Sequence, residues 1–214
     1  MESYKELLDF GKEYLRKKKI ENGDLDAWLL MEYVCKITRT WYFIHEEDKV
    51  KEEEDGIYRK FIEKRGEHIP LQQLTHEAYF FGMRFYVDEN VLAPRPDTET
   101  LVEEVLKELP GDQKAEILDM CTGSGCILLS ILANRENVQG TGVDLSEKAL
   151  NVARRNGRDC QIQARWIHSD LFENIRGKYD VIVSNPPYIR TSVIKGLMEE
   201  VRLHEPYMAL DGHE

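Results

Sequence analysis

An apolar run, VIVS at 181–184, is followed directly by Asn185-Pro186-Pro187-Tyr188. Prolines donate no backbone hydrogen bond, so the chain must leave the sheet there in a stiff turn. The Asn185 side-chain oxygen and the Pro186 carbonyl can both accept from one planar NH2 group, which orients it and stabilises positive charge developing on its nitrogen. Tyr188 can pack on a planar substrate. We therefore predict a substrate site at Asn185, Pro186, Pro187 and Tyr188, with Asn185 and Pro186 as catalytic residues.

A second cluster follows the apolar stretch AEILDM at 115–120. The turn Cys121-Thr122-Gly123-Ser124-Gly125 opens a helical pattern, and its small residues let backbone N–H groups approach a ligand. Asp144 ends the next strand pattern, 19 residues after Gly125. A carboxylate so placed can accept from both hydroxyls of a ribose, and it can also cap the following helix. We predict that this turn and Asp144 bind a cofactor, together with Asp170, Phe172 and Asn185.

The third strand pattern ends in Ser169-Asp170-Leu171-Phe172. Asp170 offers an acceptor for an exocyclic amine, and Phe172 offers a ring that can stack on a base. The glycine turn contains no lysine or arginine, which favours a nucleoside-bearing ligand without phosphates. The sequence shows no Ser-His-Asp set, cysteine nucleophile or metal-ligand spacing at these positions, so the ligand must carry its own electrophile.

The elements that position these residues alternate between strand and helix. Strand patterns cover 115–120, 138–145, 164–170 and 178–184, and helical patterns follow the first two. This alternation predicts an α/β fold with a doubly wound, Rossmann-like parallel sheet, whose ligand lies beyond the carboxyl ends of the strands.

The part of the chain before this sheet has a different pattern. Residues 1–69 show helical spacing and predict a small bundle, with Asp24 as the cap of its second helix. The aromatic residues of this part, including Phe43, are expected in its core. The stretch 70–92 contains aromatic and β-branched residues around Gly82, which indicates a β-hairpin connector. Residues 93–214 form the predicted catalytic domain.

Composition limits the class of protein. The net charge is −11, and acidic residues outnumber basic ones both in 1–92 (20 to 15) and in 93–214 (20 to 14). Neither half offers the basic field of a protein whose main partner is nucleic acid. The sequence shows no signal peptide and no apolar run long enough for a bilayer, so we expect a cytoplasmic protein without membrane contact. The four cysteines are expected to be reduced and to bind no metal.

Taken together, the motifs resemble those of S-adenosylmethionine-dependent methyltransferases that act on planar NH2 groups. The stretches APRPDTETLVEEVL, SDLF, VSNPPYI and EVRLHEPYMALDGHE closely resemble the HemK/PrmC family of release-factor glutamine N5-methyltransferases, along essentially the whole chain. This resemblance implies that 121–125 form the cosubstrate turn, that Asp144 accepts from the ribose and that Phe172 contacts the adenine side. It also implies that Asn185 to Tyr188 form the glutamine pocket, and that the helical domain helps to engage class I peptide-chain release factors, whose glutamine lies in a GGQ loop.

Two features depart from the family pattern. Cys121 stands where the family usually has glycine, so we expect a backbone there that needs no positive φ. Family members also continue beyond LDGHE with further strands. We therefore expect this sequence to be a C-terminally truncated form that binds cosubstrate weakly or not at all and turns over poorly.

Two other functions remain open from the residues. A DNA N6-adenine methyltransferase could use the same Asn-Pro-Pro-Tyr motif to hold the NH2 group of adenine, although the acidity of the chain argues against it. A non-catalytic docking module, which would use the helical domain alone, is the second alternative.

Overall fold

The computed structural model describes residues 2–109, 111 and 113–213. The chain divides into two compact units. The first, here called the helical unit, reaches to Thr75 and includes Glu199–His204; the second, the α/β unit, holds His76–Met198 and the residues from Glu205 onward. None of the helices in the described ranges is long and apolar enough to cross a membrane.

The helical unit is built around amphipathic helices. A capping box starts the first of them, because Glu6 N–H donates to Ser3 Oγ at 3.2 Å and Ser3 N–H donates to Glu6 Oε2 at 2.7 Å. Leu7, Leu30 and Tyr58 lie in its core, all fully buried. The helices are α1 (Tyr4–Lys17), α2 (Gly23–Cys35), α3 (Arg39–His45), α4 (Glu52–Gly66), α5 (Leu71–Thr75) and α10 (Glu199–His204).

Two local predictions for this unit are wrong. Asn22, rather than Asp24, is the N-cap residue of α2; Asp24 lies in the first helical turn, where its negative charge is favourable and where it pairs with Arg16. Phe43 on α3 is 72% exposed, whereas Tyr42 beside it is buried. Neighbouring residues of a helix point in different directions, so only one of the two rings can face the core of a helix at the surface.

A buried arginine connects α4 with α2 and α10. Arg65 Nε donates to Asp26 Oδ2 and Arg65 Nη2 donates to Glu200 Oε2, both at 2.7 Å. Burial raises the pKa of Asp26, although the guanidinium opposes that shift. Arg65 and Asp26 are both buried, so loss of either one would leave an uncompensated buried charge.

The α/β unit begins with the predicted hairpin. Strands β1 (Glu77–Phe80) and β2 (Met83–Tyr86) pair in antiparallel register, and Phe81 and Gly82 between them both have positive φ, +49° and +73°. A two-residue turn of this kind matches the twist of the strands. A single 3₁₀ turn η1 (Pro96–Thr98) then leads into α6 (Glu99–Glu108).

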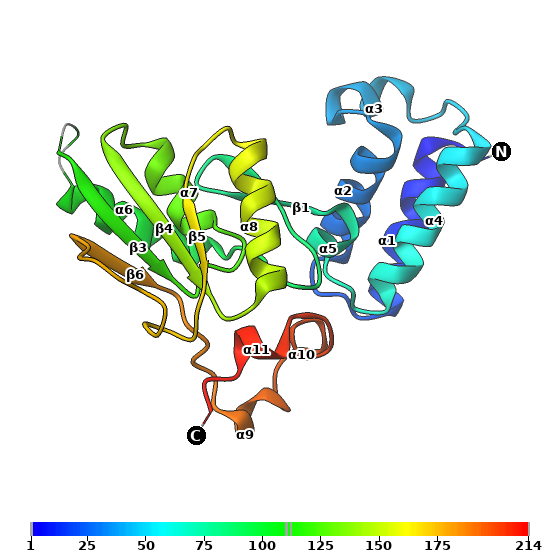
Figure 1. The fold of residues 1–214 in the computed structure, drawn as a ribbon. Helices are drawn as coiled ribbons and strands as arrows, with labels where there is room; N and C mark the ends of the chain where they lie inside the picture. Colours follow the sequence, from blue (N-terminus) through cyan, green and yellow to red (C-terminus); the bar gives the residue numbers. More distant parts are fainter. Residues whose placement is uncertain (1, 110, 112, 214) are drawn as a thin grey trace. The chain divides into compact units, whose positions relative to one another are not determined.

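The main sheet is four-stranded and parallel. Its strands β3 (Ala115–Met120), β4 (Val138–Asp144), β5 (Arg165–His168) and β6 (Val181–Ser184) lie in the order β5-β4-β3-β6, as Figure 1 shows. All three pairings are parallel, which confirms the predicted α/β sheet. Met120 pairs with Val143 and with Ser184, so the carboxyl ends of β3, β4 and β6 meet at one edge.

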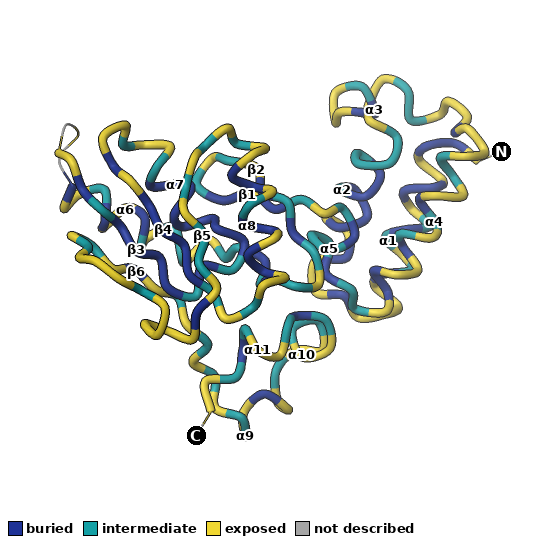
Figure 2. The backbone as a smooth tube through the Cα atoms, in the orientation of Figure 1, coloured by how far each residue is buried: buried dark blue, intermediate teal, exposed yellow. Residues whose placement is uncertain are grey.

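Helices follow the strands of this sheet in the chain. Helix α7 (Cys126–Ala133) follows β3, α8 (Glu147–Asp159) follows β4, and the short helices α9 (Thr191–Ile194) and α11 (Tyr207–Leu210) come after β6. Strand β3 is almost entirely buried, whereas only one residue of β6 is buried (Figure 2). The loops that leave β3 and β4 therefore start from the more buried part of the sheet.

Candidate functional site

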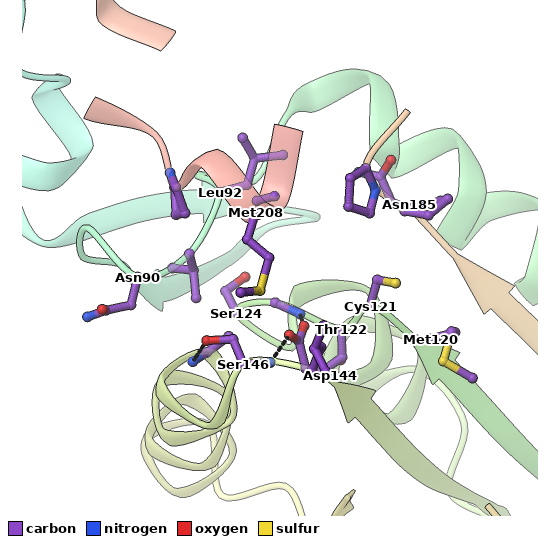
Figure 3. A pocket seen from close by; sticks show the side chains of 18 of the residues that line it. Asn90, Leu92, Met120, Cys121, Thr122, Ser124, Asp144, Ser146, Asn185 and Met208 are labelled. Carbon is purple, nitrogen blue, oxygen red and sulfur yellow. Dashed lines mark hydrogen bonds between the residues drawn. The ribbon is translucent and has the colours of Figure 1, made fainter. Parts of the chain in front are cut away.

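A pocket of about 790 Å³ opens at the carboxyl end of the sheet, entirely within the α/β unit. One side, here called the strand-end wall, is formed by Asp144 at the end of β4 and by the lining residues that follow β3, β4, β5 and β6. The other side is formed by a loop at 89–95 and by residues 205–213, here called the strap; Figure 3 shows members of both sides. The strand-end wall contains Cys121, Thr122, Gly123, Ser124, Asp144, Leu145, Ser146, Ser169, Asp170, Leu171, Asn185, Pro186 and Pro187.

The turn after β3 adopts three left-handed conformations within five residues. Cys121, Gly123 and Gly125 have φ of +60°, +54° and +79°. The Thr122 N–H donates to Val143 O at 2.9 Å, which ties the turn to β4. Gly125 also lacks space, because a Cβ there would lie 2.9 Å from the Trp166 ring. It directly precedes α7 and, unlike its four predecessors, does not line the pocket.

Cys121 contradicts the expectation drawn from its side chain. We expected a backbone without positive φ, but Cys121 adopts φ +60° and lines the pocket. An L-residue in this region is strained by roughly 1–2 kcal/mol. Burial raises the pKa of the Cys121 thiol, and the nearby carboxylate of Asp144 raises it further, so the side chain is a neutral thiol near pH 7.

Asp144 organises the turn and keeps acceptor capacity. Gly123 N–H donates to its Oδ2 at 2.9 Å and Ser146 N–H donates to its Oδ1 at 2.8 Å. Ser146, rather than Asp144, caps α8 by accepting from Ala149 N–H at 3.2 Å. A carboxylate has about four lone-pair sites, so two backbone donors leave room for two hydroxyl groups.

A second carboxylate lies beneath the turn without lining the pocket. Asp119 is fully buried and accepts from Thr122 Oγ1 at 2.6 Å, whereas its Oδ1 has no hydrogen-bond partner of normal geometry among the described residues. Burial raises the pKa of Asp119 to about 7, and the charge of Asp144 acts in the same direction. Asp119 therefore holds Thr122 in place and is close to half-protonated near neutral pH.

The structure separates the four residues after β5. Asp170 and Leu171 line the pocket, and Leu171 has a positive φ of +43°. Phe172 is 54% exposed and does not line the pocket. Of these two apolar side chains, only that of Leu171 belongs to a residue that lines the pocket.

The residues after β6 are divided in the same way. Asn185, Pro186 and Pro187 line the pocket, whereas Tyr188 is 76% exposed and does not. Ser184 Oγ donates to Met120 O at 2.8 Å, which fixes the end of β6 beside the end of β3. Asn185 and Pro186, the predicted acceptors, thus line the same pocket as the turn at 121–124.

Sequence reasoning missed the opposite side of the pocket. Leu92, Arg95 and Met208 line it, from the loop at 89–95 and from the strap. The motifs APRPDTE and EPYMALDGHE contain Arg95 and Met208, but the residue types and spacing in them indicated no binding or catalytic role. Arg95 is the one lysine or arginine among the described lining residues, beside acidic side chains that include Asp144, Asp170 and Asp211. That balance suits a ligand without phosphates.

The described part of the chain offers no set of side chains that could bind a metal ion. Residues 2–109, 111 and 113–213 contain no group of three or more His, Cys, Asp or Glu side chains placed to hold an ion.

Both parts of the chain are similar in sequence to known protein families. Residues 6–75 match the PrmC N-terminal domain family, and residues 94–202 match the Methyltransferase small domain family. The release factor glutamine methyltransferase of Caulobacter vibrioides is 38% identical over 94% of this chain and 71% of its own length. That of Leptospira interrogans is 38% identical over 95% and 73%, and that of Bacillus cereus is 36% identical over 91% and 71%. Among solved structures, an rRNA methyltransferase of T. thermophilus is 21% identical over 52% of this chain and 32% of its own, with a TM-score of 0.45.

Proposed function

Because this chain belongs to the family of release factor glutamine methyltransferases, we propose that it transfers a methyl group from S-adenosylmethionine to the side-chain amide of a glutamine in a class I peptide-chain release factor. The glutamine would be that of the GGQ loop, in accordance with the resemblance of the motifs. Because such a substrate acts in translation, the proposal includes a cytoplasmic location. The observation that carries the proposal is the convergence of the turn at 121–124, Asp144 and Asn185-Pro186 on one pocket.

The residues present fit the cosubstrate. Gly123 faces open space at positive φ, so its backbone can lie against a ligand. Asp144 retains lone pairs for two ribose hydroxyls, and Leu171 offers apolar surface for a base. S-adenosylmethionine, when bound, supplies a methyl group on a positively charged sulfur. The pocket has no cation other than Arg95 among its described lysines and arginines, so it does not oppose that charge.

The acceptors at 185 and 186 act on the amide to be methylated. An amide nitrogen is a poor nucleophile because its lone pair is delocalised into the carbonyl. The Asn185 side-chain oxygen and the Pro186 carbonyl can accept its two N–H groups, hold the nitrogen in one orientation and stabilise the positive charge that develops on it. The prolines fix φ on both sides of the Pro186 carbonyl, so these acceptors need little reorganisation during the reaction.

Glutamine is favoured over adenine as the methylated group. Both carry a planar NH2 group that two acceptors can hold. The chain is acidic in both halves, its residues 6–75 match the PrmC N-terminal domain, and the relatives are named for release factors. A DNA N6-adenine methyltransferase would need a basic surface for the backbone of its substrate.

The test compares substrates directly. The protein is incubated with S-adenosylmethionine labelled in the methyl group and with a class I release factor, the same factor carrying Gln→Ala in its GGQ loop, or duplex DNA. Label in the unmodified factor alone is the expected result. Label in DNA, or label that persists in the Gln→Ala factor, would contradict the proposal. Calorimetric titration with S-adenosylhomocysteine is run in parallel, and absence of both heat and transfer would favour the docking-module alternative.

A further inference from the structure

The strap is joined at its first end to the loop on its own side of the pocket. Glu205 is almost fully buried, with a side chain 1% exposed. It accepts from Arg95 Nη2 at 3.0 Å and from Ala93 N–H at 3.4 Å. Both donors belong to residues that line the pocket. The residues between this contact and the far end of the strap, 206–209, line the pocket as well.

At its second end the strap pairs with the chain that leaves the Asn185–Tyr188 turn. Ile189 N–H donates to Leu210 O at 3.0 Å, and Gly212 N–H donates to Ile189 O at 2.9 Å. Thr191 Oγ1 donates to Asp211 Oδ1 at 2.7 Å. These contacts form a short parallel bridge between Ile189 and Asp211. The strap therefore begins against Arg95 and ends against the turn that carries the predicted acceptors.

The closest approach in this pairing is made by Gly212. A Cβ at this position would lie 2.7 Å from Tyr188 Cα and 2.9 Å from Pro187 O. Real Cβ atoms are not found so close to backbone atoms, so a side chain would have to displace one of the two segments. Glycine is required at 212 because there is no space for a side chain; its φ does not lie in the left-handed region.

A displacement at Pro187 cannot remain local. Pro186 and Pro187 have fixed φ, so the turn moves more nearly as one piece than an ordinary loop would. The Pro186 carbonyl is one of the two predicted acceptors, and Asn185 precedes it directly. A shift of Pro187 O by a few tenths of an ångström or more is therefore passed to both acceptors, and misplacement of a reacting group by about 1 Å can cost on the order of 100-fold in rate.

We infer that Gly212 and the Thr191–Asp211 hydrogen bond position the Asn185–Pro186 acceptors for methyl transfer. Gly212 is a positioning residue, because it acts through the turn and not on the substrate. This inference rests on the proposed function. It adds a role for the strap, which is to hold the Asn185–Pro186 turn in place.

Gly212→Ala is the central variant, with Gly196→Ala as its matched control. Gly196 lies after α9, and the nearest atom to its Cβ would be Val193 O at an ordinary 3.4 Å. We expect Gly212→Ala to lower kcat about 10- to 100-fold, while the Kd for S-adenosylhomocysteine changes less than about threefold. Gly196→Ala should change neither. An unchanged kcat in Gly212→Ala, or a fall in kcat matched by an equal loss of S-adenosylhomocysteine affinity, would overturn the inference.

A second pair of variants adds no volume and guards against misfolding of Gly212→Ala. Thr191→Val removes the donor to Asp211, whereas Thr191→Ser retains it. We expect Thr191→Val to lower kcat several-fold and Thr191→Ser to restore it; equal kcat in the two variants would count against the inference.

Amide hydrogen exchange separates this inference from the proposed function. The amides of Ile189 and Gly212 should lose protection in Gly212→Ala and in Thr191→Val, but not in the control variants. Absence of methyl transfer by the unmodified protein would refute the proposed function. Unchanged protection of both amides in both variants would refute the positioning role, whether or not the unmodified protein transfers methyl groups.

Discussion

The strand-end wall and the strap enclose the same pocket but are held by different kinds of contact. Residues of the strand-end wall directly follow strands whose backbone groups pair in regular parallel register, such as Met120 with Val143 and Ser184. The strap has no strand of the main sheet. It is held by a few contacts between residues far apart in the chain, such as Glu205 with Arg95 and Asp211 with Thr191.

The two walls therefore differ in how far along the chain the contacts that fix them reach. In the strand-end wall, each predicted group is one or a few residues from a paired strand, so its position depends little on any single side chain. The strap is held by a few side-chain contacts and by a short backbone bridge, so its position depends more on single residues such as Glu205 and Gly212. Substitutions in the first wall should therefore change chemistry or binding, whereas substitutions in the second should change stability and geometry.

The largest effect is expected at Asn185. Asn185→Ala removes one of two acceptors for the amide, so we expect kcat to fall by about 1000-fold, while the Kd for S-adenosylhomocysteine stays within about threefold. Steady-state kinetics and calorimetry measure the two quantities. Ser192→Ala, at an exposed position of α9, is the control. A kcat within tenfold of the unmodified protein would rule out the acceptor role.

The next effect tests the strap. Glu205→Ala leaves the Ala93 N–H and the Arg95 guanidinium without this partner, so the free energy of unfolding should fall by on the order of 2 kcal/mol. Urea denaturation of the variant and of Glu103→Ala, which alters an exposed acid on α6, gives the comparison. Equal midpoints in the two variants would show that the strap does not depend on this carboxylate.

A smaller effect is expected for the cofactor side of the strand-end wall. Asp144→Asn keeps one oxygen acceptor and removes the charge, so the affinity for S-adenosylhomocysteine should fall about tenfold. One of the two backbone N–H groups that donate to Asp144, those of Gly123 and Ser146, loses its acceptor, so the unfolding free energy should fall by about 1 kcal/mol. Asp159→Asn, at an exposed position on the last turn of α8, is the matched control. If the two variants bind equally well, Asp144 does not contact the ligand.

The smallest effect concerns strain in the turn after β3. Cys121→Gly relieves the cost of positive φ that Cys121→Ala retains, so the glycine variant should be more stable than the alanine variant by about 1 kcal/mol. Thermal unfolding of the two variants in parallel measures this difference. An alanine variant as stable as the glycine variant would mean that the left-handed conformation of Cys121 carries no strain.

Prediction from the sequence succeeded where the determinants are local. Strand and helix periodicity placed β3, β4, β5 and β6 and their parallel arrangement, because burial of alternating elements leaves few ways to pack them. It was less accurate at single positions. The cap of α2, the exposure of Phe43 and the φ of Cys121 depend on neighbours in space that periodicity does not identify.

By itself, the sequence determined the parallel sheet, the edge at which its ligand would bind and the chemistry available at Asn185, Pro186 and Asp144. These follow from period, turn residues and side-chain type, which are properties of short segments. Only the tertiary structure decided that Leu171 rather than Phe172 lines the pocket and that Tyr188 lies outside it. It also decided that the loop at 89–95 and the strap form the wall opposite the strands, since contacts such as Glu205 with Arg95 and Gly212 with Pro187 join residues that are far apart in the chain until it has folded.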